Sequence, residues 1–189
     1  ILLMISMAVK AELTSRMFDV RHVGYAEGLS SQRVFSIVED GDGAIWIATK
    51  TGIDRYNGHA VKNYDLPGNF YYGDLAGRRL YLLYDARQGL FAYDHTGRIY
   101  RYSTIHDHFE QVLHLGLLIQ EEVILNKLCL DDDGTWWMGS DKGLYKQEAD
   151  NRIVAVLKGQ YVNDIAFADE SLYVGTSNGV WQLSHALPD

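Results

Sequence analysis

Two histidines in this chain have the residue type and spacing of a metal site. In His106-Asp107-His108 the imidazoles stand two residues apart, so on a strand both would face one side and could bind zinc. No third ligand stands out nearby except His114 or Asp85, at an unknown distance. We therefore expect this stretch to be an exposed outer loop rather than a zinc site.

Two acidic runs, Asp40-Gly41-Asp42-Gly43 and Asp131-Asp132-Asp133-Gly134, offer carboxylates for calcium. Calcium takes roughly six to eight oxygen ligands, and the EF-hand calcium loop needs a Glu at its twelfth position. The twelfth residues here are Thr51 and Lys142. Because both runs hold the same place in a sequence repeat, we expect them to be hairpin turns. We expect no metal and no cofactor.

Sugar binding is a third chemistry that the sequence offers, through tyrosines and arginines between residues 71 and 87. This stretch departs from the repeat described below, and loops vary where ligands bind. Tyrosine and arginine would suit an acidic or neutral sugar, although simple drift in a loop explains the same departure. The weak candidates for ligand binding are Tyr71, Tyr72, Arg78, Arg79, Tyr84 and Arg87. We expect no catalytic residue, because the acidic residues lie mainly at turn positions.

The strands that must position these residues belong to a sequence repeat that occurs four times. Aligned on the glycine after a polar turn, the copies are 45, 46 and 36 residues apart, close to the roughly 40–50 residues of a propeller blade. An aromatic residue stands six positions before each glycine, and we expect it to wedge between blades. The structural repeat positions are Trp46, Gly52, Phe91, Gly97, Trp137, Gly143, Tyr173 and Gly179.

Each copy reads as short strands separated by tight turns. In the clearest copy an apolar run at 34–38 precedes a Gly-Asp turn, a β-branched and aromatic strand covers 45–49, and strands at 53–56 and 59–64 follow. Four antiparallel strands make one blade. We therefore predict an all-β protein of β-propeller blades, with about four repeats near residues 30–66, 70–115, 120–158 and 160–189.

The sequence leaves two possibilities for how the blades close into a propeller ring. The fourth copy lacks its outer strand, and residues 17–23 are a moderate candidate for a strand that would close a four-bladed ring. The preferred interpretation is that this chain is the front of a longer propeller, because each blade must stack against neighbours on both faces.

Charge and cysteine content narrow the classes of function. With 17 basic and 25 acidic residues the formal net charge is −8, which argues against binding a nucleic-acid backbone, since that requires a basic face. The single cysteine, Cys129, cannot form an internal disulfide and is expected to be a small buried apolar residue.

The first eleven residues, Ile1 to Ala11, are apolar and end in small side chains. This pattern is typical of the tail of a signal peptide with a cleavage site near Ala8 or Ala11, and a buried first strand is the alternative. The stretch is too short to span a bilayer. We expect the propeller fragment to occupy residues 12–189.

The repeat resembles the two-component regulator propeller repeat. That pattern has a Gly-Leu-Ser opening, an apolar strand, Glu-Asp, a glycine turn, Ile-Trp-Ile-Gly-Thr, then Gly-Leu and Arg-Tyr. This chain has Gly28-Leu29-Ser30, Glu39-Asp40, Ile45-Trp46-Ile47-Ala48-Thr49, Gly52-Ile53 and Arg55-Tyr56. The third copy matches at 136–145 and the fourth at 172–180, whereas the second is degenerate.

The resemblance implies the sensory end of a hybrid two-component regulator. In that family two seven-bladed periplasmic propellers and a β-sandwich precede a membrane helix and a histidine kinase, and oligosaccharides switch on genes for glycan use. For this segment it implies an oligosaccharide ligand, contact with the remaining blades, no catalysis and no direct nucleic-acid contact. For the parent it implies a homodimer tethered to the inner membrane. A secreted scaffold for protein partners, or a propeller polysaccharide lyase or glycosidase, remains an alternative.

Overall fold

The computed structural model describes residues 19–67, 79–150, 152–169 and 171–184, and within them the chain is almost entirely β-structure. Its strands form three four-stranded sheets and one three-stranded sheet, each with its strands in sequence order. All neighbouring strands are antiparallel. These sheets are blades 1 to 4 of a propeller, so the predicted fold class is confirmed. The stretch predicted to be a signal-peptide tail lies outside the described residues.

The elements follow one another blade by blade. Blade 1 consists of β1 (Val34–Glu39), β2 (Ile45–Thr49), β3 (Ile53–Tyr56) and β4 (Val61–Tyr64). Blade 2 consists of β5 (Leu80–Asp85), β6 (Gly89–Asp94), β7 (Arg98–Ser103) and β8 (His108–His114). Blade 3 consists of β9 (Leu125–Leu130), β10 (Trp136–Ser140), β11 (Gly143–Gln147) and β12 (Ile153–Lys158). Blade 4 consists of β13 (Val162–Ala168), β14 (Ser171–Thr176) and β15 (Gly179–Ser184). Two short helices, η1 (Tyr25–Glu27) and α2 (Leu115–Ile119), lie before blade 1 and between blades 2 and 3.

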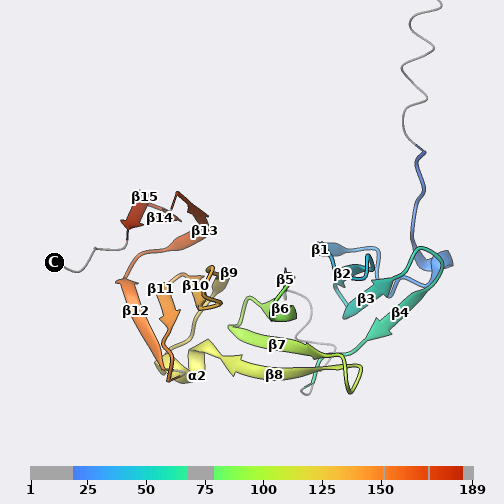
Figure 1. The fold of residues 1–189 in the computed structure, drawn as a ribbon, viewed down its shortest axis with the longest axis horizontal. Coiled ribbons are helices and arrows are strands. Elements are labelled where there is room, and N and C mark those ends of the chain that lie inside the picture. The colour runs from blue at the N-terminus through green and yellow to red at the C-terminus, as the bar shows by residue number, and fades with distance from the viewer. Residues whose placement is uncertain (1–18, 68–78, 151, 170, 185–189) are drawn as a thin grey trace, which may run out of the picture.

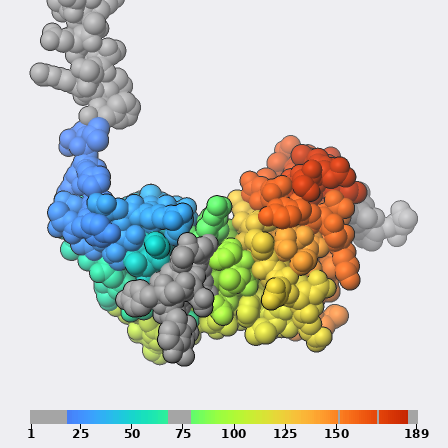
Figure 2. Space-filling view, turned by 180° about the vertical axis from the view of Figure 1, so that it is seen from behind, coloured from blue at the N-terminus to red at the C-terminus, as the bar shows by residue number. Residues whose placement is uncertain are grey.

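The four blades lie side by side along an open arc (Figure 1). The first strand of each blade is innermost, since β1 contacts β5 and β9 contacts β13, and in blades 1 to 3 the fourth strand forms the outer edge. Neighbouring blades touch along the arc, whereas blades 1 and 4 stand apart (Figure 2). Residues 19–23, part of the stretch considered for ring closure, form no strand. The described chain is therefore an arc of blades and not a closed four-bladed ring.

An aspartate organises the first turn of blades 1 and 3. Oδ1 of Asp40 accepts the backbone N–H groups of Asp42 and Ala44 at 3.0 and 2.9 Å. In blade 3, Oδ1 of Asp131 accepts those of residues 133 and 135 in the same way. A glycine completes each turn with a positive φ of 79°, which favours glycine. The two acidic runs are hairpin turns, as predicted.

A hydroxyl group closes the second turn in three of the four blades. Oγ1 of Thr49 donates to the carbonyl of Gly52 at 3.1 Å, and Ser140 and Thr176 make the equivalent bonds at 3.0 and 2.9 Å. Blade 2 has Asp94 at this position, and its Oδ1 accepts the backbone N–H of Thr96 instead. A short polar side chain three residues before the glycine therefore satisfies this turn in every copy.

Three separate apolar clusters lie in the seams between consecutive blades. In blade 2, Leu90 and Ala92 pack toward blade 1, whereas their neighbours Phe91 and Tyr93 pack toward blade 3. This division follows from the alternation of side chains along a strand. A third cluster joins blades 3 and 4 around Val162 and other buried residues. Because a strand is covered on both faces, its sequence is apolar almost throughout.

Candidate functional site

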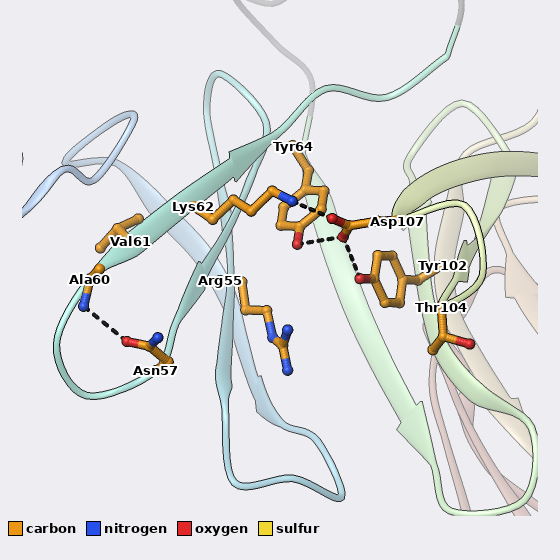
Figure 3. A pocket seen from close by; sticks show the side chains of 9 residues that line it. All are labelled: Arg55, Asn57, Ala60, Val61, Lys62, Tyr64, Tyr102, Thr104 and Asp107. Atoms are coloured by element: carbon orange, nitrogen blue, oxygen red, sulfur yellow. Dashed lines mark hydrogen bonds and ion pairs between the residues drawn. The ribbon is translucent and has the colours of Figure 1, made fainter.

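A groove of about 410 Å³ opens between the outer strands of blades 1 and 2 (Figure 3). Its walls come from the β3–β4 hairpin of blade 1 and the β7–β8 hairpin of blade 2, which lie at the same end of their blades. We call it the blade 1/2 groove, and its lining residues are Arg55, Asn57, Ala60, Val61, Lys62, Tyr64, Tyr102, Thr104 and Asp107.

Aromatic rings from both blades pack together beneath the groove. Trp46 is 1% exposed, and its ring centroid lies 5.1 Å from that of Tyr64 and 4.7 Å from that of Tyr102. Phe109 meets Trp46 edge-on at 5.9 Å. The guanidinium of Arg55 lies over the Trp46 ring at 5.3 Å. The blade 1/2 groove therefore lies over a buried aromatic cluster and has a cation at its wall.

Asp40 links this aromatic cluster to the first turn of blade 1. Its Oδ2 accepts the indole N–H of Trp46 at 2.6 Å and lies 3.5 Å from Nη2 of Arg55. Burial alone would raise the pKa of Asp40. The hydrogen bonds from Trp46 and two backbone N–H groups, with the Arg55 charge, outweigh burial and lower that pKa below its usual value. The carboxylate therefore stays ionised at neutral pH.

Asp107 joins the two walls of the groove. Its carboxylate accepts hydrogen bonds from the hydroxyls of Tyr64 and Tyr102, at 2.8 and 2.6 Å, and contacts the ammonium group of Lys62. The hydrogen bond from Lys62, with those from the two tyrosines, holds the pKa of Asp107 well below its usual range. Burial and the bond to this carboxylate raise the pKa of Tyr102. The network fastens the outer edge of blade 1 to that of blade 2.

Arg55 is a lining residue with unused hydrogen-bonding capacity. Its Nε is buried without a hydrogen-bond partner, while the side chain as a whole is 33% exposed. Five donors on a planar guanidinium suit a ligand with several oxygen atoms. Asp40 and Asp107 both have lowered pKa values, whereas a glycosidase needs one carboxyl that stays protonated. Neither Asp40 nor Asp107 has the raised pKa of such an acid.

The tyrosines and arginines predicted for ligand binding do not converge in the described residues. Tyr71, Tyr72 and Arg78 lie outside those residues. Arg79 precedes β5 and Tyr84 is near its other end, a separation of about 16 Å at a strand rise of roughly 3.3 Å per residue.

Two of these predicted residues have structural partners in neighbouring blades. The guanidinium of Arg87 donates to the backbone carbonyls of Asp131 and Asp132 in blade 3, and the Tyr84 hydroxyl packs against Gly41 in the first turn of blade 1.

Sequence reasoning did not single out Lys62, Tyr64, Tyr102 or Asp107 as one set. The available signal was the pair of tyrosines at or near the ends of β4 and β7.

Of the aromatic repeat positions, Trp46, Phe91 and Trp137 lie in the seams, whereas Tyr173 belongs to none of the three seam clusters. Phe91 is 1% exposed, whereas Trp137 and Tyr173 are half-buried. A Cβ on Gly52 would lie 2.7 Å from the backbone carbonyl oxygen of Tyr64, so the chain approaches too closely for a side chain there. The other three repeat glycines have positive φ angles: Gly97, Gly143 and Gly179.

The structure adds a third group to the histidine pair. Both ligands considered from the sequence are occupied elsewhere: His114 contacts the Thr96 carbonyl, and the Asp85 carboxylate accepts backbone N–H groups of residues 87 and 88. Glu110, which sequence reasoning missed, lies beside both His106 and His108. The signal was three potential ligands, two histidines and a glutamate, at the alternate positions 106, 108 and 110.

Comparisons with known proteins point to a repeat and a fold. Residues 28–51 match the family model described as two component regulator propeller, so the predicted repeat is confirmed there. A search of curated proteins finds no match. Among the residues that the structure describes, no helix is both long and apolar enough to cross a membrane.

Solved structures from B. thetaiotaomicron share the fold. One extracellular domain of a protein described as a hybrid two component system is 22% identical with a TM-score of 0.67, covering 90% of this chain and 24% of that one. Another is 16% identical with a TM-score of 0.65, covering 87% and 26%. The present chain thus spans about a quarter of the length of these relatives.

Enzymes also share this architecture. A virginiamycin B lyase from Staphylococcus aureus is 14% identical with a TM-score of 0.55, covering 82% of this chain and 57% of that one. At such identities the likeness establishes a common propeller fold and leaves the chemistry to the residues of the site.

Proposed function

We propose that this chain is part of the sensory propeller of a hybrid two-component regulator and carries no catalytic activity itself. The main support is the match to the two component regulator propeller model at residues 28–51. This match is in register with three further copies of the sequence repeat. The similarity in fold to extracellular domains of hybrid two component systems supports the same assignment. The parent would be exported, anchored in the inner membrane and dimeric, with its kinase outside this segment.

The missing part of the ring would consist of further blades, so that the complete propeller has seven. Both ends of the arc support this proposal, because each exposes apolar side chains that a neighbouring blade could cover. Ile37 in blade 1 is 60% exposed, and Val180 in blade 4 is 73% exposed. In the three seams the comparable surfaces are buried.

The ligand would be an oligosaccharide, and the blade 1/2 groove is the site in the described residues that suits one best. Sugars offer many hydroxyls and apolar ring faces, and the groove combines the guanidinium of Arg55 with tyrosine hydroxyls over a buried aromatic cluster. The ionised state of Asp40 and Asp107 favours binding over hydrolysis. In the intact sensor, ligand binding here would bias how blades 1 and 2 sit against each other.

The proposal is tested by melting the intact protein against a panel of oligosaccharides. A ligand that binds only the folded state adds roughly 2.7 kcal/mol of stability at a hundredfold excess over its dissociation constant. We expect one sugar to raise the melting temperature, and Arg55→Gln to abolish that shift.

Arg101→Gln is the matched control, since Arg101 lies over Phe91 of blade 2 as Arg55 lies over Trp46. A sugar shift that survives in Arg55→Gln would place the ligand elsewhere on the sensor. Turnover of a glycan would overturn the proposal in favour of an enzyme. No shift with any sugar, together with capture of a protein partner, would favour a scaffold.

A further inference from the structure

A cluster of three potential metal ligands lies on the outer edge of blade 2, apart from the groove's binding surface. His106 is in the turn between β7 and β8, His108 is the first residue of β8, and Glu110 follows two positions later. Residues 108 and 110 share one face of the strand because side chains alternate, and the turn brings His106 over the same face. The three side chains are 62%, 54% and 51% exposed.

Two of the three distances among the donor atoms match the edges of a zinc coordination shell. Nδ1 of His106 lies 3.3 Å from Oε1 of Glu110, and Nε2 of His108 lies 3.2 Å from the same oxygen. One donor atom from each residue lies within 4.8 Å of the others. Zinc binds histidine nitrogen and carboxylate oxygen at about 2.0–2.1 Å in a tetrahedron, whose ligand-to-ligand edges are then about 3.3 Å.

The protonation pattern of His108 also favours a cation. Its Nδ1 lies 3.2 Å from the backbone carbonyl of His106, and a carbonyl only accepts, so Nδ1 carries the proton in that bond. In neutral imidazole Nε2 then has a lone pair, and that lone pair faces the Glu110 carboxylate. Two acceptors at this distance repel unless a proton or metal lies between them. A ring N–H bonded to a carbonyl is also the usual arrangement of a metal-ligating histidine.

Hydrogen bonds without a metal are the competing explanation. A neutral His106 can donate its Nδ1–H to Glu110, so only His108 would need a second proton. The His106 and His108 rings are stacked, with centroids 5.5 Å apart and planes inclined by 24°. One divalent ion held by two neutral rings and one carboxylate fits the same positions, and zinc binding separates the two arrangements.

The turn that carries these ligands is anchored before any ion binds. Asp107, between the two histidines, has a φ of 55°, and its carboxylate is held by Tyr64 and Tyr102 and by Lys62 of blade 1. Ser103 further accepts the backbone N–H of His106 at 3.2 Å. Asp107 is thus committed to blade 1, and its charge offsets that of Lys62 beside the cluster.

We propose that His106, His108 and Glu110 form a surface site for a divalent transition metal of the zinc type. Two nitrogens and one oxygen suit zinc, whereas magnesium and calcium prefer oxygen ligands. Three protein ligands leave a coordination position open, and the exposure of the side chains gives water or an external donor access to it. The inference is independent of the sugar ligand proposed above, since it uses none of the groove's binding groups.

Titration calorimetry with zinc ion on the intact protein at neutral pH tests the site. We expect one zinc ion per chain, and at least about tenfold weaker binding in His108→Ala and in Glu110→Gln. His59→Ala is the matched control, because His59 is an exposed histidine in the corresponding hairpin of blade 1, and we expect it to bind zinc like the unaltered protein. Calcium and magnesium should give no heat attributable to this site.

Imidazole NMR signals provide a readout that does not depend on heats. Zinc should shift the ring signals of His106 and His108 and leave those of His59 unchanged. The proposal is overturned if the unaltered protein binds no zinc, or if His108→Ala binds it as tightly. An unchanged melting temperature of each apo variant would show that the loss of binding does not come from unfolding.

Discussion

Blades 1 and 3 contain the same turn and the same tryptophan, but the two rings are covered differently. The indole N–H donates to Asp40 at 2.6 Å in blade 1 and to Asp131 at 2.9 Å in blade 3. A cation pairs across the strand with each ring, Arg55 at 5.3 Å from Trp46 and Lys146 at 5.4 Å from the ring of the second tryptophan, Trp137.

The difference lies in the next blade. Trp46 is 1% exposed because Tyr102 and Phe109, from the outer two strands of blade 2, pack on it. Trp137 is half-buried, and its aromatic neighbour is Phe167 of β13, 6.3 Å away and itself 42% exposed. Within its described residues blade 4 has three strands, so no fourth strand stands where β8 stands in blade 2. The repeat builds the turn locally, and the neighbouring outer strand decides how deeply the ring is buried.

Removal of the tryptophan ring should give the largest difference in stability between blades 1 and 3. We expect Trp46→Ala to lower the free energy of unfolding by about 3–5 kcal/mol, the usual cost of truncating a large buried aromatic residue. Trp137→Ala should cost less, because its ring is covered only in part. Urea unfolding of this 189-residue chain measures both, and equal losses would contradict the role given to the outer strand.

Substitution of an exposed apolar residue at the open end of blade 4 should show whether a further blade covers that end. Val180→Lys should leave the stability of the chain expressed alone within about 0.5 kcal/mol, because the side chain is 73% exposed there. In the intact protein the same substitution should destabilise by about 1–3 kcal/mol, since it would bury an unpaired charge against the next blade. Thermal or urea unfolding of both forms is the measurement. An equally neutral effect in the intact protein would argue against a blade on that face.

Loss of the turn aspartate should have a smaller effect that depends on pH. The pKa of Asp40 is lowered in the folded state, so its contribution to stability is present above the unfolded pKa, near 3.8, and is lost as the pH falls through the folded value. Asp40→Asn should therefore be less stable than the unaltered protein by about 1–3 kcal/mol at neutral pH. The two proteins should converge in stability as the pH falls below about 4, and urea unfolding across pH shows whether the gap closes.

The smallest effect concerns the thiol in blade 3. Burial raises the pKa of Cys129 to about 12, so almost no thiolate forms at neutral pH. We expect reaction with a thiol reagent to be slow in the folded protein and to become fast in denaturant, as a colorimetric thiol assay would show. Rapid labelling under native conditions would mean that the seam between blades 3 and 4 opens. Cys129→Ser would be the blank.

Much of the fold could be predicted because its signals are local. The Asp-Gly turns and the hydroxyl that precedes three of the four repeat glycines satisfy backbone groups within four residues, so a sequence window contains both partners. The strand spans of blade 1 fall within two residues of those predicted. The same local signals made the acidic runs recognisable as turns and not as calcium loops.

The candidate sites could not be predicted, because their residues meet across blades or across a turn. Tyr64 and Asp107 are 43 residues apart in the chain, and their contact depends on how two blades stack. Arg87 was predicted for ligand binding, yet it reaches carbonyls 44 and 45 residues away. Glu110 became a partner of His106 and His108 only once the turn at Asp107 was formed.

The sequence by itself determined the blades, since period, turn chemistry and alternation of side chains act within a single copy of the repeat. Only the tertiary structure decided which aromatic rings are buried, which arginine has unused donors and which histidines share a carboxylate. The physical reason is that the first two properties depend on the stacking of one sheet on the next, which brings together side chains that the repeat places about a blade apart, and the third depends on the turn at Asp107.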